Sequence, residues 1–201
     1  MNTYCNFPNI KLNVAGLFTH SDLIITLKNL LYNKYKISNI ITEIYGAPNI
    51  CWNGGRVIYK NKSIEIEKEL SKVINAGLRP VIIFSNPIIT DEMLKDSDSN
   101  ALLKLGLKYN AKFIISNDKL MNYIQASYPN VDIKISLIKV ALDNGLSNLN
   151  YYKQLEESFN SYVIHPDDNL NFSLLKDQLL YMNMNLILLQ LSLLSVLMVN
   201  L

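Results

Sequence analysis

Apolar and polar residues along this chain follow two periods, one typical of strands and the other typical of helices. Residues 10–18 alternate apolar with polar side chains, whereas residues 23–31 repeat apolar side chains at helical spacing. Residues 80–84 are apolar throughout, as expected of a strand that is buried on both faces. The pattern therefore predicts strands and helices in alternation, with Thr19 or Ser21 capping the first helix.

The same alternation extends through most of the chain. Further strands are predicted at residues 40–44, 112–115, 132–137, 162–164 and 185–189. Further helices are predicted at residues 63–76, at a short segment that Thr90 or Asp91 begins, and at residues 101–109, 119–126, 151–159 and 172–180. No two-residue hairpin turn joins two strands, so the order indicates right-handed βαβ units and a parallel sheet.

Such a sheet has two possible closures, an open doubly wound sheet and a (β/α) barrel. Polar residues follow nearly every predicted strand. The carboxyl ends of barrel strands form one rim, whereas an open sheet concentrates its ligand groups at a switch point. Neither GxGxxG nor GxxxxGK[ST] follows the first strand, which disfavours a nucleotide-binding open sheet. We therefore predict an α/β fold with a TIM-like parallel barrel of about six or seven strands, incomplete at its C-terminus.

Length and composition place this fold in one domain, residues 1–201, with residues 1–9 as a loose lead-in. The formal net charge of +2 gives no general electrostatic attraction to nucleic acid. Cys5 and Cys51 lie far apart and indicate neither a disulfide framework nor a zinc site. With no signal-peptide pattern at the N-terminus, a cytoplasmic location is the expectation.

The C-terminal segment, residues 182–201, is anomalous because it is almost entirely apolar. Residues 186–199 contain only three polar side chains, yet a transmembrane helix needs about 20 apolar residues. Three interpretations stay open: a seventh strand with a buried helix, a hydrophobic membrane anchor, and a truncated or frameshifted C-terminus. A complete barrel of this type usually takes about 250 residues, which favours truncation or frameshift. An exposed apolar tail would also promote self-association.

The densest cluster of titratable residues follows the predicted strand at residues 162–164. His165 beside Asp167 and Asp168 suits general acid–base catalysis, and the three side chains together suit a divalent metal. The structural alternative is that Asp167, Asp168 or Asn169 caps the next helix, with Pro166 fixing the approach of the chain. His165 and Asp167 are the catalytic candidates under the first interpretation.

Glu43 is the third catalytic candidate, because a charged residue is unusual within an apolar strand. It is expected near the end of its strand. Inside a barrel its carboxylate needs a partner, since an unpaired buried carboxylate is costly, and Arg56 or Lys134 can supply one. A functional role and a structural ion pair both fit this pattern.

Substrate-binding candidates lie in the loops after the strands. In the segment GAPNICWNGGR, Asn53 is a polar donor and Arg56 suits a carboxylate or phosphate, while Trp52 either stacks on a ligand ring or packs beneath a tight turn. Beyond later strands, the remaining candidates are Asn86, Asn117 and Asp118. These three orient a substrate under one interpretation and cap helices under the other.

The strand ends PVIIFSN, AKFIISND, VDIKISL and SYVIHPDDNLNFSLLK resemble those of the collagenase-like peptidase family. The resemblance covers about residues 79–180 and implies a parallel barrel with short strands that end in polar residues. Family members that modify tRNA or hydroxylate small molecules carry C-terminal cysteines for an iron–sulfur cluster. No cysteine follows Cys51 here, so that ligand set is absent and the residues specify no particular cofactor.

Two functional hypotheses result. In the first, the chain is an enzyme-type barrel that acts on a small polar or anionic substrate, with His165 as the acid–base group and Arg56 as the anion clamp. In the second, it is a non-catalytic scaffold or inactive fragment in which the same side chains only cap helices.

Overall fold

A six-stranded parallel sheet is the centre of the computed structural model, which describes residues 11–37, 40–54, 63–159, 161–168, 171, 173 and 174. The strands run in chain order, and each pairs in parallel with the next. They are β1 (Leu12–Ala15), β2 (Ile41–Gly46), β3 (Arg79–Phe84), β4 (Lys112–Ile115), β5 (Ile133–Ile135) and β6 (Ser161–Tyr162).

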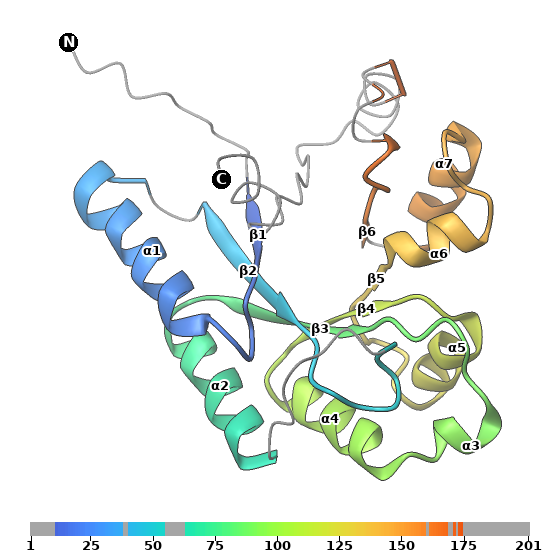
Figure 1. The fold of residues 1–201 in the computed structure, drawn as a ribbon, viewed down its shortest axis with the longest axis horizontal. Coiled ribbons are helices and arrows are strands. Elements are labelled where there is room, and N and C mark those ends of the chain that lie inside the picture. Colours follow the sequence, from blue (N-terminus) through green and yellow to red (C-terminus); the bar gives the residue numbers. More distant parts are fainter. Residues whose placement is uncertain are drawn as a thin grey trace, which may run out of the picture.

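The sheet curls into a half-barrel (Figure 1). Its strand order has no reversal, whereas a doubly wound sheet reverses its order at the switch point. The prediction of a curled parallel sheet is therefore confirmed, and the open doubly wound alternative is wrong.

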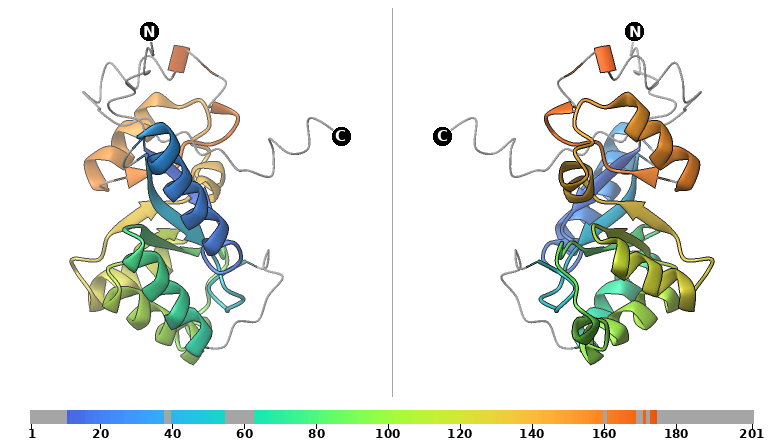
Figure 2. Two further views of the ribbon diagram at one scale, coloured as in Figure 1. Left: turned by 90° about the vertical axis from the view of Figure 1, so that its left-hand side faces the viewer. Right: turned by 90° about the vertical axis from the view of Figure 1, so that its right-hand side faces the viewer.

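The helices lie along the convex side of this sheet (Figures 1 and 2). Right-handed crossovers between neighbouring parallel strands all return on one side, which explains the arrangement. The helices are α1 (Ser21–Tyr35), α2 (Ser63–Asn75), α3 (Asp91–Leu94), α4 (Ser97–Lys108), α5 (Asp118–Ser127), α6 (Leu137–Leu142) and α7 (Leu149–Ser158).

Most of the predicted elements within the described residues are present. The observed caps confirm the predicted start of α3 and correct the predicted cap of α1. Thr90 caps α3 as predicted, because its side chain accepts a hydrogen bond from the Met93 amide. The cap predicted for α1 is wrong. His20 occupies that position without a side-chain hydrogen bond, and the Ser21 hydroxyl instead donates to Glu69 of α2.

The bounds of β5 and α4 differ more from the prediction, and α6 was not predicted. The strand predicted at residues 132–137 ends at Ile135, and α6 follows at once because the Ser136 hydroxyl accepts a hydrogen bond from the Ile138 amide at 3.2 Å. Helix α4 also begins earlier than predicted, since Asp96 caps it through the Ser99 amide at 2.8 Å. The predicted helix at 172–180, apart from residues 173 and 174, lies outside the described residues, as do the strand at 185–189 and the apolar segment 182–201.

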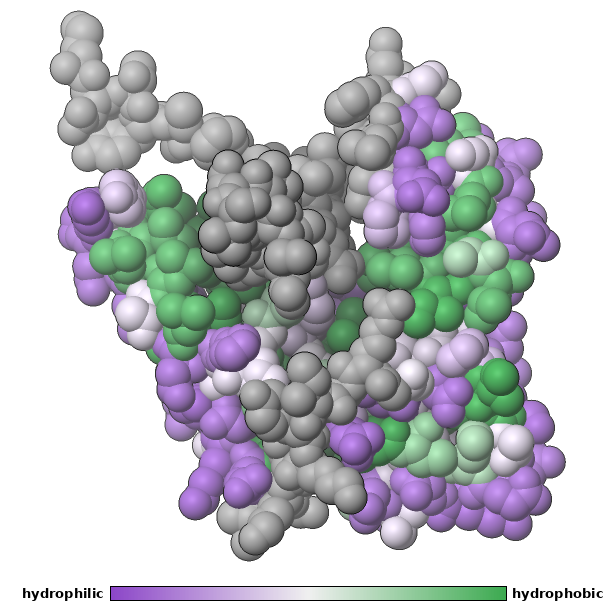
Figure 3. All heavy atoms as spheres, viewed as in Figure 1, coloured by the Kyte–Doolittle hydropathy of each residue, from purple (hydrophilic) through white to green (hydrophobic). Residues whose placement is uncertain are grey.

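The described helices and their outer surface give two further observations. Within the described ranges, no helix combines the length and the apolar character that a membrane span requires. Apolar side chains do gather on the outer surface of α1 (Figure 3), where Leu23, Leu30 and Tyr32 are exposed.

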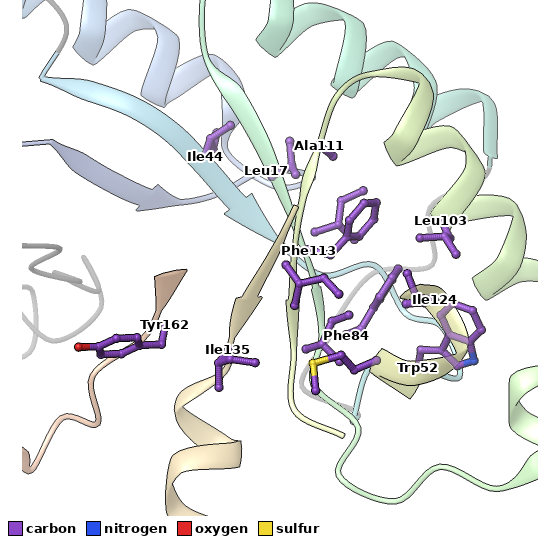
Figure 4. Close-up of a cluster of buried hydrophobic side chains, with 14 of the residues drawn as sticks. Leu17, Ile44, Trp52, Phe84, Leu103, Ala111, Phe113, Ile124, Ile135 and Tyr162 are labelled. Carbon is purple, nitrogen blue, oxygen red and sulfur yellow. The ribbon is translucent and has the colours of Figure 1, made fainter. Parts of the chain in front are cut away.

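The core lies between the sheet and the helices (Figure 4). Aromatic rings dominate its centre: Trp52 packs edge-on against Phe84 at 5.3 Å between ring centroids, and Phe84 stacks on Phe113 at 5.5 Å. Both geometries are preferred for aromatic pairs and add to the free energy gained by burying the rings.

Gly106 of α4 allows this close packing. A Cβ at this position would lie 2.8 Å from Ile82 Cδ1 and 2.8 Å from Phe113 Cζ, and both of those side chains are fully buried. We expect Gly106→Ala to lower the free energy of unfolding by about 1–3 kcal/mol, because overpacking outweighs the better helix propensity of alanine. Urea denaturation measures the change, and exposed Lys104→Ala on the same helix is the control. An unchanged or higher stability of Gly106→Ala would contradict this account of the packing.

Candidate functional site

The concave face of the half-barrel carries charged side chains. Side chains alternate between the two faces of a strand. The positions that pack in the core against the helices include Val14, Ile44, Phe113 and Ile135. Glu43, Lys112 and Lys134 lie one position away from such residues and therefore face the concave side.

These three side chains form one buried ion-pair cluster, which we call the inner-face cluster. Glu43 Oε1 lies 2.7 Å from Lys112 Nζ, and Glu43 Oε2 lies 3.3 Å from Lys134 Nζ. The exposed fractions of the side chains are 12% for Glu43, 13% for Lys112 and only 3% for Lys134. Two ammonium groups thus share a single carboxylate, and the cluster holds one excess positive charge when both lysines are protonated.

Burial and charge act in opposite directions on the pKa values in this cluster. Burial alone would raise the pKa of Glu43, but the Lys134 and Lys112 ammonium groups outweigh burial and bring that pKa below its ordinary value. Burial lowers the pKa of Lys134, and the attraction of Glu43 does not restore it. The carboxylate is therefore held ionised, whereas Lys134 gives up its proton more readily than an ordinary lysine.

Two unsatisfied polar atoms lie beside the inner-face cluster. Asn13 pairs in register with Glu43, and Ser161 pairs in register with Lys134. Asn13 Oδ1 and Ser161 Oγ are both buried and have no hydrogen-bond partner within the part of the chain described. Such atoms are rare in folded proteins and are expected to meet a water molecule or a ligand.

The sequence identified part of this cluster. Glu43 lies in the middle of β2 and not at its end, so that detail of the prediction is wrong. Its expected pairing with Lys134 is confirmed, while Arg56 lies outside the described residues. Lys112 was missed, although it carries a related signal, a charged residue at the start of an otherwise apolar strand.

Asn53 holds the loop after β2 in place. Its Nδ2 donates to the Pro48 carbonyl at 3.2 Å, and its Oδ1 accepts from the Ser85 hydroxyl at 2.7 Å. The neighbouring Trp52 is fully buried and donates from Nε1 to the Met93 carbonyl at 2.7 Å. The packed interpretation of Trp52 is therefore confirmed, and its ring is not available for a ligand in this conformation.

Asn86 and Asn117 are also engaged within the protein. Asn86 Nδ2 donates to the Cys51 carbonyl at 2.9 Å, which ties the loop after β3 to the loop after β2. Asn117 Oδ1 caps α5 through the Leu120 amide at 3.2 Å, and its Nδ2 donates to the Pro87 carbonyl at 2.8 Å. Both side chains therefore have structural roles in the loops at the rim.

Asp118 forms an ion pair at the start of α5. Its Oδ2 lies 2.8 Å from Lys139 Nζ, and the same ammonium group lies 2.7 Å from Asp143. Burial disfavours the charged lysine, but the two carboxylates prevail and raise the pKa of Lys139. This lysine is consequently held protonated, whereas the pKa of Lys134 is lowered.

The cluster after β6 separates into an exposed and a buried part. His165 Nδ1 lies 3.6 Å from Asp167 Oδ2, and the Asp167 side chain is 80% exposed. Asp168 is 1% exposed and accepts hydrogen bonds from the Ser147 amide at 2.9 Å and the Tyr152 hydroxyl at 2.7 Å. Burial and the bond to Asp168 raise the pKa of Tyr152. Asp168 thus anchors the loop before α7, while His165 and Asp167 remain at the rim.

The rim and the concave face supply different chemistry. In the described segments, no group of three or more His, Cys, Asp or Glu side chains is arranged to hold a metal ion. The inner-face cluster instead offers ammonium donors, one carboxylate and two polar atoms that have no partner among the described residues.

The fold and this cluster define a parallel α/β half-barrel with a charged concave face. Comparison of the chain with protein-family models, with curated proteins and with solved structures gave no match.

Glu43→Gln tests the energetic role of the inner-face cluster. The substitution keeps the shape of the side chain but leaves two buried ammonium groups without a counter-charge, so we expect a loss of about 3–5 kcal/mol in the free energy of unfolding. Urea denaturation measures it. The matched control is Glu67→Gln, which breaks the exposed ion pair with Lys108 and is expected to change stability little. Equal effects of the two substitutions would contradict the account.

The difference in stability between the wild type and Glu43→Gln is expected to depend on pH. Because the pKa of Glu43 in the folded protein is below its ordinary value of 4.5, its charge stabilises the fold above that pH. The contribution is lost as the pH falls through the lower folded-state pKa. The difference in stability between the wild type and Glu43→Gln should therefore be full at neutral pH and shrink below pH 4.5.

Asp167 and Asp168 are neighbours in the sequence, but we expect substitutions at the two positions to differ strongly in their effect on stability. Asp168→Ala leaves the Ser147 amide and the buried Tyr152 hydroxyl without their acceptor, and an unsatisfied buried group costs about 1–3 kcal/mol. We expect a loss of about 1–3 kcal/mol in urea denaturation. Asp167→Ala should stay within about 0.5 kcal/mol of the wild type. A larger effect at Asp167 than at Asp168 would refute the anchoring role.

Proposed function

We propose that this chain is a partial TIM-type barrel that binds a small anionic substrate on its concave face, with the inner-face cluster holding the anionic group. The observation that carries the proposal is that, among the described residues, Lys112 and Lys134 share one carboxylate, Glu43. The nearby Arg79 and Asp132 form their own ion pair at 2.6 Å and add no net charge.

A buried charge without a partner is costly, and a ligand carboxylate or phosphate compensates it. The unpartnered atoms beside the cluster extend this argument. Asn13 Oδ1 is an acceptor, and the Ser161 hydroxyl both donates and accepts. A ligand with a hydroxyl group next to its anionic group, such as a small 2-hydroxy acid, has complementary hydrogen-bonding atoms.

Two features support the TIM-type barrel. Six consecutive parallel strands place all the carboxyl ends at one rim. Exposed apolar side chains on α1, among them Leu23 and Leu30, suit packing against a further helix, as a closed barrel would supply (Figure 3). A parallel barrel is also what the resemblance to the collagenase-like peptidase family implies.

A specific observation favours the second candidate function, a non-catalytic scaffold. The side chains of Asn53, Asn86, Asn117 and Asp118 all bond to other parts of the protein. Under this hypothesis the inner-face cluster is also purely structural. Ligand binding at the concave face distinguishes the two functions.

The test uses lactate and inorganic phosphate as anionic probes and lactamide as the neutral control, with affinity measured by isothermal titration calorimetry. We expect an anion to bind the wild type and lactamide not to bind. Lys112→Met should weaken anion binding at least about tenfold, as expected from the loss of one hydrogen bond to a charged group. Exposed Lys108→Met is the matched control.

Two results would overturn the proposal: binding of lactate and lactamide with equal affinity, or no binding of either anion. The comparison of lactate with lactamide needs only the wild type, so it remains a valid test even if Lys112→Met does not fold.

A further inference from the structure

The two lysines of the inner-face cluster are not equivalent. Lys112 lies closer to the shared carboxylate, at 2.7 Å compared with 3.3 Å for Lys134. Lys134 is also the more deeply buried of the two, with 3% of its side chain exposed. One carboxylate balances one ammonium group, so the more deeply buried Lys134 is the lysine of the pair that gives up its proton more readily.

A second buried lysine, Lys139, shows how the number of neighbouring carboxylates changes the pKa of a lysine. Lys139 lies between two carboxylates, Asp118 and Asp143, at 2.8 and 2.7 Å. Those carboxylates raise the pKa of Lys139, whereas burial and the neighbouring Lys112 lower the pKa of Lys134 against the attraction of Glu43 and Asp132. A lysine beside another cation in a buried site is the arrangement that activates an amine as a nucleophile.

We propose that the Lys134 side-chain amine forms a Schiff base with the carbonyl carbon of a small 2-oxo carboxylate, whose carboxylate group is bound by Lys112. The inference rests on the proposed function, because it takes the anionic ligand to bind at the inner-face cluster. It adds the reacting group of the protein and the reacting carbon of the ligand.

The step balances without an oxidant or a reductant. The lone pair of Lys134 Nζ forms the bond to the carbonyl carbon, and the carbonyl π electrons move to oxygen. Nitrogen then gives up its two protons, and the former carbonyl oxygen receives them and leaves as water, so that a carbon–nitrogen double bond forms. Glu43 Oε2, 3.3 Å from Nζ, is placed to accept each proton and pass it on.

The unpartnered atoms suit this intermediate. Ser161 is the register partner of Lys134, so its hydroxyl lies on the strand next to the reacting nitrogen and can hydrogen-bond to the departing oxygen. Asn13 Oδ1 is the register neighbour of Glu43 on β1, and it can accept a hydrogen bond from a donor on the part of the ligand that lies beside that carboxylate. Both atoms are positioning groups, and neither exchanges a proton in the step.

Reductive trapping tests the proposal on the full chain. The wild-type protein is incubated with pyruvate as the 2-oxo acid probe, reduced with sodium borohydride, and digested for peptide mapping by mass spectrometry. We expect one stable secondary-amine adduct, located on Lys134. Lactate has no carbonyl group that can form an imine and should give none.

Two variants test whether Lys134 is the lysine that forms the adduct. Lys134→Arg keeps a positive charge but lacks the nucleophilic amine, and it should abolish the adduct. The matched control is Lys139→Arg, which removes the other buried lysine and should leave the adduct unchanged. Peptide mapping of the wild type identifies the modified lysine by itself, so the test does not depend on either variant folding.

The outcomes separate this inference from the proposed function. Lactate binding without an adduct on Lys134 overturns the inference and leaves the anion site in place. An adduct spread over exposed lysines, or one that persists in Lys134→Arg, also overturns it. Failure of every anionic probe to bind overturns both.

Discussion

The concave face of this half-barrel depends on the Glu43 carboxylate. The described helices lie on the convex side of the sheet, so within the described residues the concave face is formed by strand side chains, and two strands place lysines there. Glu43 is the counter-charge that makes both lysines tolerable in a buried position. Its two oxygens also connect β2 with β4 and β5 across β3. Strands lie about 4.8 Å apart, so contacts between such distant strands are favoured by concave curvature. The ion pairs and the curl of the sheet therefore support each other.

The chemistry of a buried lysine depends on how many carboxylates surround it. Lys139 has two and is held protonated, so its role is to tie α6 to the start of α5. Lys134 shares one carboxylate with another lysine, and burial then lowers the pKa of its amine. Both residues look alike in the sequence, because each is a lysine in an apolar segment. Only the packing distinguishes a structural cation from a candidate nucleophile.

The sequence predicted the order of elements well because strands and helices differ in hydrophobic period. Strand β4 matches its predicted bounds at residues 112–115, and the stop of α2 before Gly77 follows from the left-handed conformation of that glycine. Helix α6 was missed because its six residues are too few to show a helical period, and Ser136 resembles the end of a strand. The site was harder to predict. Lys112 and Asn13 meet Glu43 only through strand register, and register between distant segments is not encoded locally.

Polar residues at the ends of parallel strands turn out to be weak evidence for a site. Each such strand is followed by a helix whose first amide groups need acceptors, so Asn117 and Ser136 are required whether or not a ligand binds. A charged residue in the middle of a strand has no comparable local duty, because the backbone groups there already pair with neighbouring strands. Its burial must be balanced by a specific partner. At Lys134 that balance is incomplete within the protein, and an incomplete balance in a buried position is a physical reason to expect a ligand.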